Sequence, residues 1–494
     1  MWNRYWKWIS YLAYPFFLCL LFSNPTQGQG TWEFDSEDQM TYQNLLSLKT
    51  NSSLINLEKD RASTQYLKHF HNSIELLISD DQSQIKAYEK TTQQVLDFIK
   101  NQPKDSPYYK FYTADILLQS AFVHLKLGHE FTAGWELRRA YREINRNIKA
   151  YPDFVPQYKT IGLLHVIIGS VPEKYNWVLS IMGMEGTVKQ GIEALTKLAN
   201  SNNTFKVEGE LLIMLMQAYL LQDTNASARG LKKLFNADHS NLLIGYLYVS
   251  VLMKSQQNEL AIETINKINK ELNAEHIGFP LLKYLLAEAF LRKGNYQLAI
   301  AEYQKFRNRI KGDNYQKDAL YKMGLSYWLL NEQDSTSKYF RMAIKNGITL
   351  TEVDKHASKE LNSELARNKK ILEVRLLTDG GYYDKALEKL NLIKTTELNN
   401  SRDEIEFNYR KARIYHQSGQ LNAAIAFYKL TINSGAKNNW YFAPNSALQL
   451  GFIYQEDDNK YLAEKYFNMA LSYKDHEYKN SIDNKAKSAL STLK

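Results

Sequence analysis

The stretch LGFIYQEDDNKYLAEKYFNMA, residues 450–470, decides the fold. Gly451 is followed three residues later by Tyr454, and Ala463 is followed four residues later by Phe467. Spacings of three and four place residues on one face of an α-helix. The polar run between the two pairs is typical of a short turn. The stretch therefore predicts two antiparallel helices, in which a small residue on the first lets the second pack close to it.

The same pattern recurs in the preceding residues, and it is the pattern of a tetratricopeptide repeat. The small residues of the second helices are Ala299, Thr336, Ala386, Ala424 and Ala463, so their spacings are 37, 50, 38 and 39 residues. The standard unit has about 34, which means that the turns between units are lengthened. The other matching residues are Leu286, Ala287, Phe290 and Tyr303; Met323, Gly324, Tyr327, Phe340 and Ala343; Gly381, Tyr383 and Leu390; Ala412, Tyr415 and Tyr428; Leu450 and Ala470.

The composition agrees with a helical chain. Only 22 glycines and 9 prolines occur in 494 residues, too few for the many tight turns of an all-β protein. Hydrophobic residues make up 44%, which excludes a disordered chain. We therefore predict an all-α fold, an α-solenoid of tetratricopeptide-like helical hairpins in a right-handed superhelix.

The chain divides by sequence pattern into four parts. Residues 1–30 are a signal peptide or N-terminal anchor, 31–156 are helical hairpins, 157–278 are a glycine-containing helical region, and 279–494 are the repeats. Hairpins are predicted from 84–126 with 129–150, from 208–222 with 225–236, and from 241–254 with 257–271. Prolines 103 and 107 mark a break within the first of these.

The N-terminus is typical of an exported protein. Arg4 and Lys7 precede an apolar run from Ile9 to Phe22, which is shorter than the roughly 17–25 residues of a spanning helix. A cleaved signal peptide is favoured, and an uncleaved anchor is the alternative. The predicted location is periplasmic or envelope-associated. Cys19 is the single cysteine, so an intramolecular disulfide and a cysteine-rich zinc site are excluded.

The net charge of +9 is spread thinly along the chain. The densest basic runs are 138–146 and 307–311. Nucleic-acid binding needs a more focused stripe, so we predict no nucleic-acid partner. Solvated helix faces are the simpler interpretation, and attraction to an anionic membrane surface is the alternative.

Motifs for catalysis or metal binding are missing from the sequence. The ten histidines are scattered, and no nucleophile elbow, phosphate loop or calcium loop occurs. We predict a protein that is not an enzyme and that has no cofactor and no metal. An unrecognised hydrolase stays an alternative that converging histidine and carboxylate side chains would revive.

Residues 162–195 carry a distinct pattern. An apolar helix from Gly162 ends at Ser170 and Val171-Pro172, and Trp177 opens a short helix. Met182-Gly-Met-Glu-Gly186 forms a turn, and Gly191-Ile192 with Leu195 begins another helix. This resembles the signature of the tetratricopeptide repeat protein 39 family, which includes the fungal inclusion-body-clearance proteins. Met184 stands where that family usually has Phe. The resemblance implies a helical-repeat protein without catalytic residues, and relatives linked to lipid handling and aggregate clearance.

The first helices of the repeats are predicted to line a concave groove. Rings give rigid contact area and guanidinium groups bind carboxylates, so aromatics with arginines suit peptide capture. Packing between repeats is the alternative role. We predict a scaffold that binds a protein or peptide partner, with a lipid- or envelope-surface-binding protein as the alternative function. The candidate partner contacts are Tyr284, Glu288, Arg292, Tyr321, Trp328, Arg375, Tyr409, Arg413 and His416.

Overall fold

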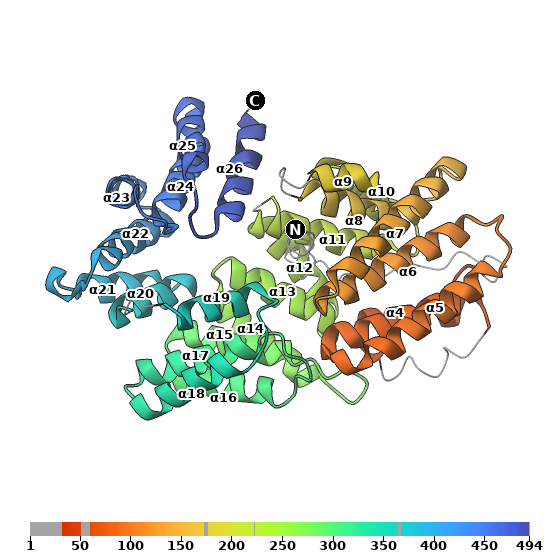
Figure 1. Ribbon diagram of the computed structural model, residues 1–494, viewed down its shortest axis with the longest axis horizontal. Coiled ribbons are helices and arrows are strands. Elements are labelled where there is room, and N and C mark those ends of the chain that lie inside the picture. The colour runs from red at the N-terminus through yellow and green to blue at the C-terminus, as the bar shows by residue number, and fades with distance from the viewer. Residues whose placement is uncertain (1–31, 51–59, 172–175, 222, 364–366, 494) are drawn as a thin grey trace. The chain divides into compact units, whose positions relative to one another are not determined.

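A computed structural model describes residues 32–50, 60–171, 176–221, 223–363 and 367–493. Within these ranges every regular element is a helix, which confirms the predicted all-α fold (Figure 1). The predicted signal peptide or anchor lies outside the described residues, as does Pro172 of the family signature. The handedness of the superhelix stays a prediction.

The chain forms two compact units. Unit 1 contains the described residues up to Glu288 and also Gln297–Asn362. Unit 2 contains Ala289–Tyr296 and the described residues from Ser363 onward, so α15 (Leu281–Lys293) contributes to both. The boundaries predicted at 156 and 278 stay predictions.

The helices of unit 1 are α2 (Ser36–Leu46), α4 (Ala62–Ser79), the 3₁₀ turn η2 (Gln82–Gln84), α5 (Ile85–Lys100), α6 (Pro107–Lys126), α7 (Glu130–Ala150), α8 (Gln157–Gly169), α9 (Asn176–Met182), α10 (Val188–Asn200), α11 (Lys206–Tyr219), α12 (Thr224–Ala237), α13 (Leu242–Lys254), α14 (Asn258–Glu271), α16 (Tyr296–Arg307), α17 (Gln316–Leu329), α18 (Gln333–Lys345) and α19 (Glu352–Leu361). Those of unit 2 are α20 (Lys369–Asp379), α21 (Tyr383–Asn391), the 3₁₀ turn η4 (Thr395–Glu397), α22 (Ser401–Gln417), α23 (Leu421–Gly435), α24 (Phe442–Glu456), α25 (Lys460–Ser472) and α26 (Lys479–Leu493).

Consecutive helices pack as hairpins. The pairs α11 with α12 and α13 with α14 confirm two of the predicted hairpins, and α6 with α7 forms the third. The stretch 84–126 contains two helices, because α5 ends at Lys100 and α6 starts anew at Pro107. Ser106 caps α6 through its side chain, and Pro107 occupies the first turn, where its missing N–H is not needed.

Glycines on the first helices create room for the second helices, as the sequence pattern predicts. A Cβ added at Gly451 would lie 2.5 Å from the ring of Phe467, and one added at Gly324 would lie 2.5 Å from the ring of Phe340. The aromatic ring of the second helix therefore occupies the space that a larger residue on the first helix would need.

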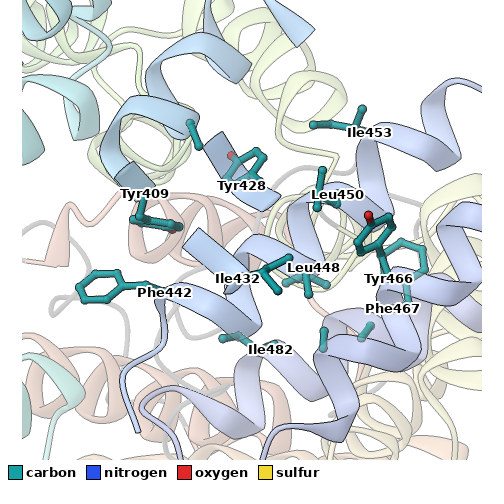
Figure 2. Close-up of a cluster of buried hydrophobic side chains, with 14 of the residues drawn as sticks. Tyr409, Tyr428, Ile432, Phe442, Leu448, Leu450, Ile453, Tyr466, Phe467 and Ile482 are labelled. Carbon is teal, nitrogen blue, oxygen red and sulfur yellow. The ribbon is translucent and has the colours of Figure 1, made fainter. Parts of the chain in front are cut away.

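The core of unit 2 consists of two clusters, one from α22 to α26 (Figure 2) and a smaller one from α20 to α22. Tyr428 and Phe467 are fully buried in the larger cluster, and Phe442 and Leu448 contribute from α24. Each helix presents one apolar stripe to its neighbours, so no single hairpin buries its own face alone.

Unit 1 contains contacts over long sequence distances. The backbone N–H and the side-chain amide of Asn314 donate to the two carboxylate oxygens of Asp80 at 3.1 and 2.8 Å, although 234 residues separate them. The N–H of Ile277 donates to the carbonyl of Leu48 at 2.8 Å. Unit 1 is therefore held by more than contacts between adjacent hairpins.

The glycine-containing region forms a tight corner of α8, α9 and α10. A Cβ added at Gly191 would lie 2.6 Å from the carbonyl oxygen of Gly162 and 2.8 Å from the backbone nitrogen of Val166. The backbones of α8 and α10 therefore touch here.

Candidate partner-binding site

The first helices of the hairpins in unit 2 lie in one row. Helix α20 contacts α22, α22 contacts α24, and α24 contacts α26, while α21, α23 and α25 are the second helices. In stacked helical hairpins such a row forms an extended binding surface. Side chains of this row that are not used in packing are therefore candidate partner contacts.

One side of helix α22 is buried in the core, and Arg413 lies at the edge of that buried side. Tyr409 and Ala412 lie in the core cluster of Figure 2, at 3% and 0% exposure. Arg413 follows at once and is half-buried, with its Nη1 donating to Gln449 Oε1 of α24 at 3.1 Å. This partner is neutral, and within the described ranges no carboxylate forms an ion pair with Arg413. The guanidinium has five N–H groups, and the contact with Gln449 uses one of them.

Further arginines meet at the end of α20. The Nε of Arg375 lies 3.6 Å from Asp379 Oδ2, and both side chains are more than one-third exposed. Arg292, in the last turn of α15, donates from Nη1 to the backbone carbonyl of Asp379 at 3.4 Å. A cation here also offsets the partial negative charge of the helix C-terminus. The fold thus brings together residues that are 87 positions apart in the sequence.

Arg410 supports these residues from within. Its Nη2 donates to Glu406 Oε1 at 2.7 Å and to the hydroxyl oxygen of Tyr441 at 2.8 Å. Its Cζ lies 5.1 Å from the ring centroid of Tyr409. The side chain is only 5% exposed, so Arg410 fixes the positions of its neighbours and does not face a ligand.

We name the exposed part of this arrangement the arginine face; it consists of Arg292, Arg375, Asp379, Arg413 and His416. Burial, and the nearby Arg413 guanidinium, lower the pKa of His416 to about 4, so the imidazole is neutral at pH 7. Three arginines and one aspartate then give the face a net charge of +2. A guanidinium matches the two oxygens of a carboxylate, so the face is suited to acidic side chains or a chain terminus.

Two of the candidate residues belong to an internal ion cluster in unit 1. The Nζ of Lys322 lies 2.7 Å from Glu288 and 2.9 Å from Asp318, and the Tyr284 hydroxyl donates to Asp318 at 2.5 Å. Burial raises the pKa of Asp318 to about 6, while Lys322 opposes that rise. Glu288 is therefore held by Lys322 inside unit 1.

The remaining candidate aromatics are packed between helices. Tyr321 is 3% exposed and its ring stacks on Phe340 with centroids 5.9 Å apart. Tyr284 and Tyr409 are 4% and 3% exposed, and Trp328 of α17 is half-buried. Because the three tyrosine rings are enclosed, we leave them out of the site proposed below.

The sequence analysis did not single out Asp379, Arg410 or Gln449. One signal was available for Arg410: Glu406 precedes it by four residues, which is the spacing of an ion pair on a helix. No comparable signal exists for Gln449, which reaches Arg413 from the next hairpin.

A second ion cluster, in unit 1, was also not anticipated. We name it the Lys159 cluster: Lys159 Nζ lies 2.9 Å from Asp115 Oδ2 and 2.9 Å from Glu208 Oε2. The hydroxyl of Tyr66 donates to Asp115 at 2.8 Å, and that of Tyr42 donates to Glu208. Burial raises the pKa of Glu208 to about 7, with Asp115 adding to the rise and Lys159 opposing it. All five side chains are buried, so this cluster is structural and does not offer a surface.

Two kinds of site are absent from the described ranges. No group of three His, Cys, Asp or Glu side chains lies where it could hold a metal ion. No described helix combines the length and apolar character needed to cross a bilayer.

Comparison with known proteins identifies one repeat. Residues 405–432, which span most of α22 and the greater part of α23, match the tetratricopeptide repeat model. This range contains the predicted pattern of Ala412, Tyr415, Ala424 and Tyr428. No curated protein sequence matches the chain.

Several solved structures resemble the chain at low identity. A tetratricopeptide repeat protein from Parabacteroides merdae is 17% identical, with 57% of this chain and 97% of that chain covered and a TM-score of 0.24. The human IFIT1 dimer with PPP-AAAA is 14% identical, with 89% and 95% covered and a TM-score of 0.33. The tetratricopeptide domain of P58(IPK) is 16% identical, with 86% and 98% covered and a TM-score of 0.21.

Proposed function

We propose that the chain is a non-enzymatic scaffold that binds an acidic segment of a partner protein on the arginine face of unit 2. One observation carries the proposal: Arg375 lies 3.6 Å from the Asp379 carboxylate, Arg292 donates to the Asp379 backbone carbonyl, and Arg413 lies on the adjacent first helix α22. Stacked helical hairpins are general protein-interaction surfaces, and an excess of guanidinium groups favours carboxylates over other ligands.

We expect each arginine of the face to contribute a modest share of the binding free energy. A hydrogen bond to a charged group contributes about 1.5–3 kcal/mol, and an exposed ion pair contributes about 0–1 kcal/mol. Arg375 is partly exposed and Arg413 is half-buried, so the free energy that each contributes to binding lies between these two values. Removal of both should weaken binding by about 10- to 100-fold.

Fluorescence anisotropy with labelled peptides tests the proposal. The probe is an aspartate- and glutamate-rich peptide with a free C-terminus, and its counterpart carries asparagine and glutamine and a C-terminal amide. We expect the full chain to bind the acidic probe preferentially and the Arg375→Ala/Arg413→Ala variant to lose that preference. The matched control is Arg229→Ala/Arg341→Ala, which removes two exposed arginines of unit 1.

Two results would count against the proposal. One is equal binding of the acidic and neutral probes by the unsubstituted chain. The other is an equal loss of affinity in the control variant, which would assign the effect to net charge alone. Circular dichroism of both variants establishes that the helices remain folded.

Two finer points belong to the same proposal. Export from the cytoplasm is supported by the sequence of residues 1–30, and the relation to the tetratricopeptide repeat protein 39 family is supported by residues 162–195. Fractionation of cells that express the tagged chain tests the first point, since an exported chain is recovered with the envelope or periplasm.

A further inference from the structure

Helix α7 exposes a continuous side that the partner-binding proposal does not use. At 100° per residue, its exposed side chains fall within an arc of about 100°. Phe131 and Trp135, at the start of the arc, are 62% and 48% exposed, and their rings meet edge to face with centroids 6.2 Å apart. The arc continues with the exposed cations Arg139, Arg142, Arg146 and Lys149.

The position of this side is fixed by the opposite side of α7. Ala133, Leu137, Ala140 and Ile144 are fully buried, and α7 packs along α6. The exposed rings of Phe131 and Trp135 therefore point away from the core of a well-packed helix. Contact of such large apolar side chains with water is unfavourable, and burial against a partner would remove that cost.

Helix α9 is attached to the same helix. The Nε of Arg138 donates to the carbonyl of Met182 at 3.0 Å, and its guanidinium lies 5.4 Å from the ring centroid of Trp135. On α9, Trp177 and Ile181 are 46% and 65% exposed and lie one helical turn apart. Two neighbouring helices thus expose large apolar side chains. We name the exposed side chains of α7 and α9 together the α7–α9 face.

Carboxylates are scarce on the exposed arc of α7. Glu136 contacts His124, whose Nδ1 lies 2.8 Å from Glu136 Oε2, and Glu130 is buried. Glu143 forms an ion pair with Arg146 at 2.8 Å. Glu185, in the turn after α9, is exposed, and its backbone bonds to the hydroxyl of Tyr141. Of the four exposed cations on the arc, Arg146 is paired with a carboxylate, whereas Arg139, Arg142 and Lys149 form no ion pair within the described ranges.

We propose that the α7–α9 face docks on the surface of an anionic lipid bilayer. Tryptophan and phenylalanine side chains enter the interfacial region, and arginine and lysine meet the headgroups. The 21 residues of α7 form a straight strip about 30 Å long. A protein partner generally meets a mixture of donors and acceptors. The polar groups of this strip are almost all cationic donors, so the charge complementarity favours a continuous anionic surface.

A fluorescent label beside Phe131 tests the proposal in the full chain. The single cysteine is replaced by Cys19→Ser, and Thr132→Cys is labelled with an environment-sensitive dye. A label at Tyr461→Cys, an exposed position on α25, reports on a surface outside the face. Vesicles of phosphatidylcholine containing phosphatidylglycerol are compared with vesicles of phosphatidylcholine alone.

We expect the emission at position 132 to shift to shorter wavelength with the anionic vesicles only, and the emission at position 461 to stay constant. Each cation near an anionic surface contributes about 1 kcal/mol, so Arg139→Gln/Arg142→Gln should weaken vesicle binding by about 30-fold. The control Lys232→Gln/Lys233→Gln removes two exposed cations of α12 and should leave binding nearly unchanged.

Three outcomes would overturn the proposal: no shift at position 132, the same shift with neutral vesicles, or equal weakening by the two pairs of substitutions. Attachment through residues 1–22 alone gives the first of these outcomes, because the chain would bind vesicles while position 132 stays in water. Phe131→Ala/Trp135→Ala provides a second test, and unchanged binding in that variant would likewise overturn the proposal.

Discussion

Replacing Glu208 by Gln tests the energetics of the Lys159 cluster. One ammonium lies between two carboxylates, so ionised Glu208 leaves a buried excess of negative charge. Folding raises the pKa of Glu208 from 4.5 to about 7. A raised pKa stabilises the folded chain fully below about pH 4.5, and this stabilisation is lost as the pH rises through about 7. At about 1.36 kcal/mol per pKa unit, the loss at pH 8 is about 3 kcal/mol.

The substitution Glu208→Gln keeps an acceptor for the Tyr42 hydroxyl and removes the charge. Relative to the unsubstituted chain, the variant should therefore be more stable at about pH 8 than at about pH 5, by about 2.5 kcal/mol. Any change in packing is the same at both pH values and cancels in this comparison. Hydrogen exchange of amides in α8 and α11 measures the opening free energy of this part of unit 1.

Glu193→Gln, at an exposed position on α10, is the matched control and should give no pH-dependent difference. The reasoning would be refuted if Glu208→Gln had the same effect at both pH values, or if it cost more stability at the higher pH.

Two other predictions concern packing and acid stability. Gly451→Val should lower the melting temperature at a cost of about 1–3 kcal/mol, because Phe467 lies 2.5 Å from the added Cβ. Melting of the circular dichroism signal measures this, with Gly278→Val, which has open space, as the control. Burial lowers the pKa of His69 from 6.5 to about 4, so the folded chain loses about 3 kcal/mol as the pH falls across that range. In urea unfolding, the free energy of unfolding should decrease less at acid pH in His69→Gln than in the unsubstituted chain. An equal decrease in both would contradict the attribution of this effect to His69.

The helical hairpins could be predicted because their signals are local. Gly451 and Phe467 are 16 residues apart, and the contact between them follows from the period of the helix and the length of one turn. The breaks at the prolines are equally local, since Pro107 restricts its own φ and that of the residue before it.

The candidate site could be predicted only in part. Sequence register placed Arg375 and Arg413 on first helices, but the same register also selected Tyr321 and Tyr409, which are buried. Exposure at a given register depends on the side chains of the neighbouring hairpin, such as Phe340 beside Tyr321. The ion clusters could not be predicted from the sequence for a different reason. Lys159 and Glu208 are 49 residues apart and belong to different hairpins, so no short pattern contains them both.

The Lys159 cluster also sets the smallest piece of unit 1 that can reach its native state. Its side chains come from α2, α4, α6, α8 and α11, and Tyr42 and Glu208 are 166 residues apart. An ammonium removed from water without its partners is strongly unfavourable. During folding, this region therefore completes its core only when α11 is present, and fragments that end before residue 208 expose or misplace Lys159. The hairpins α22–α23 and α24–α25 have no such long-range requirement and can form one after the other.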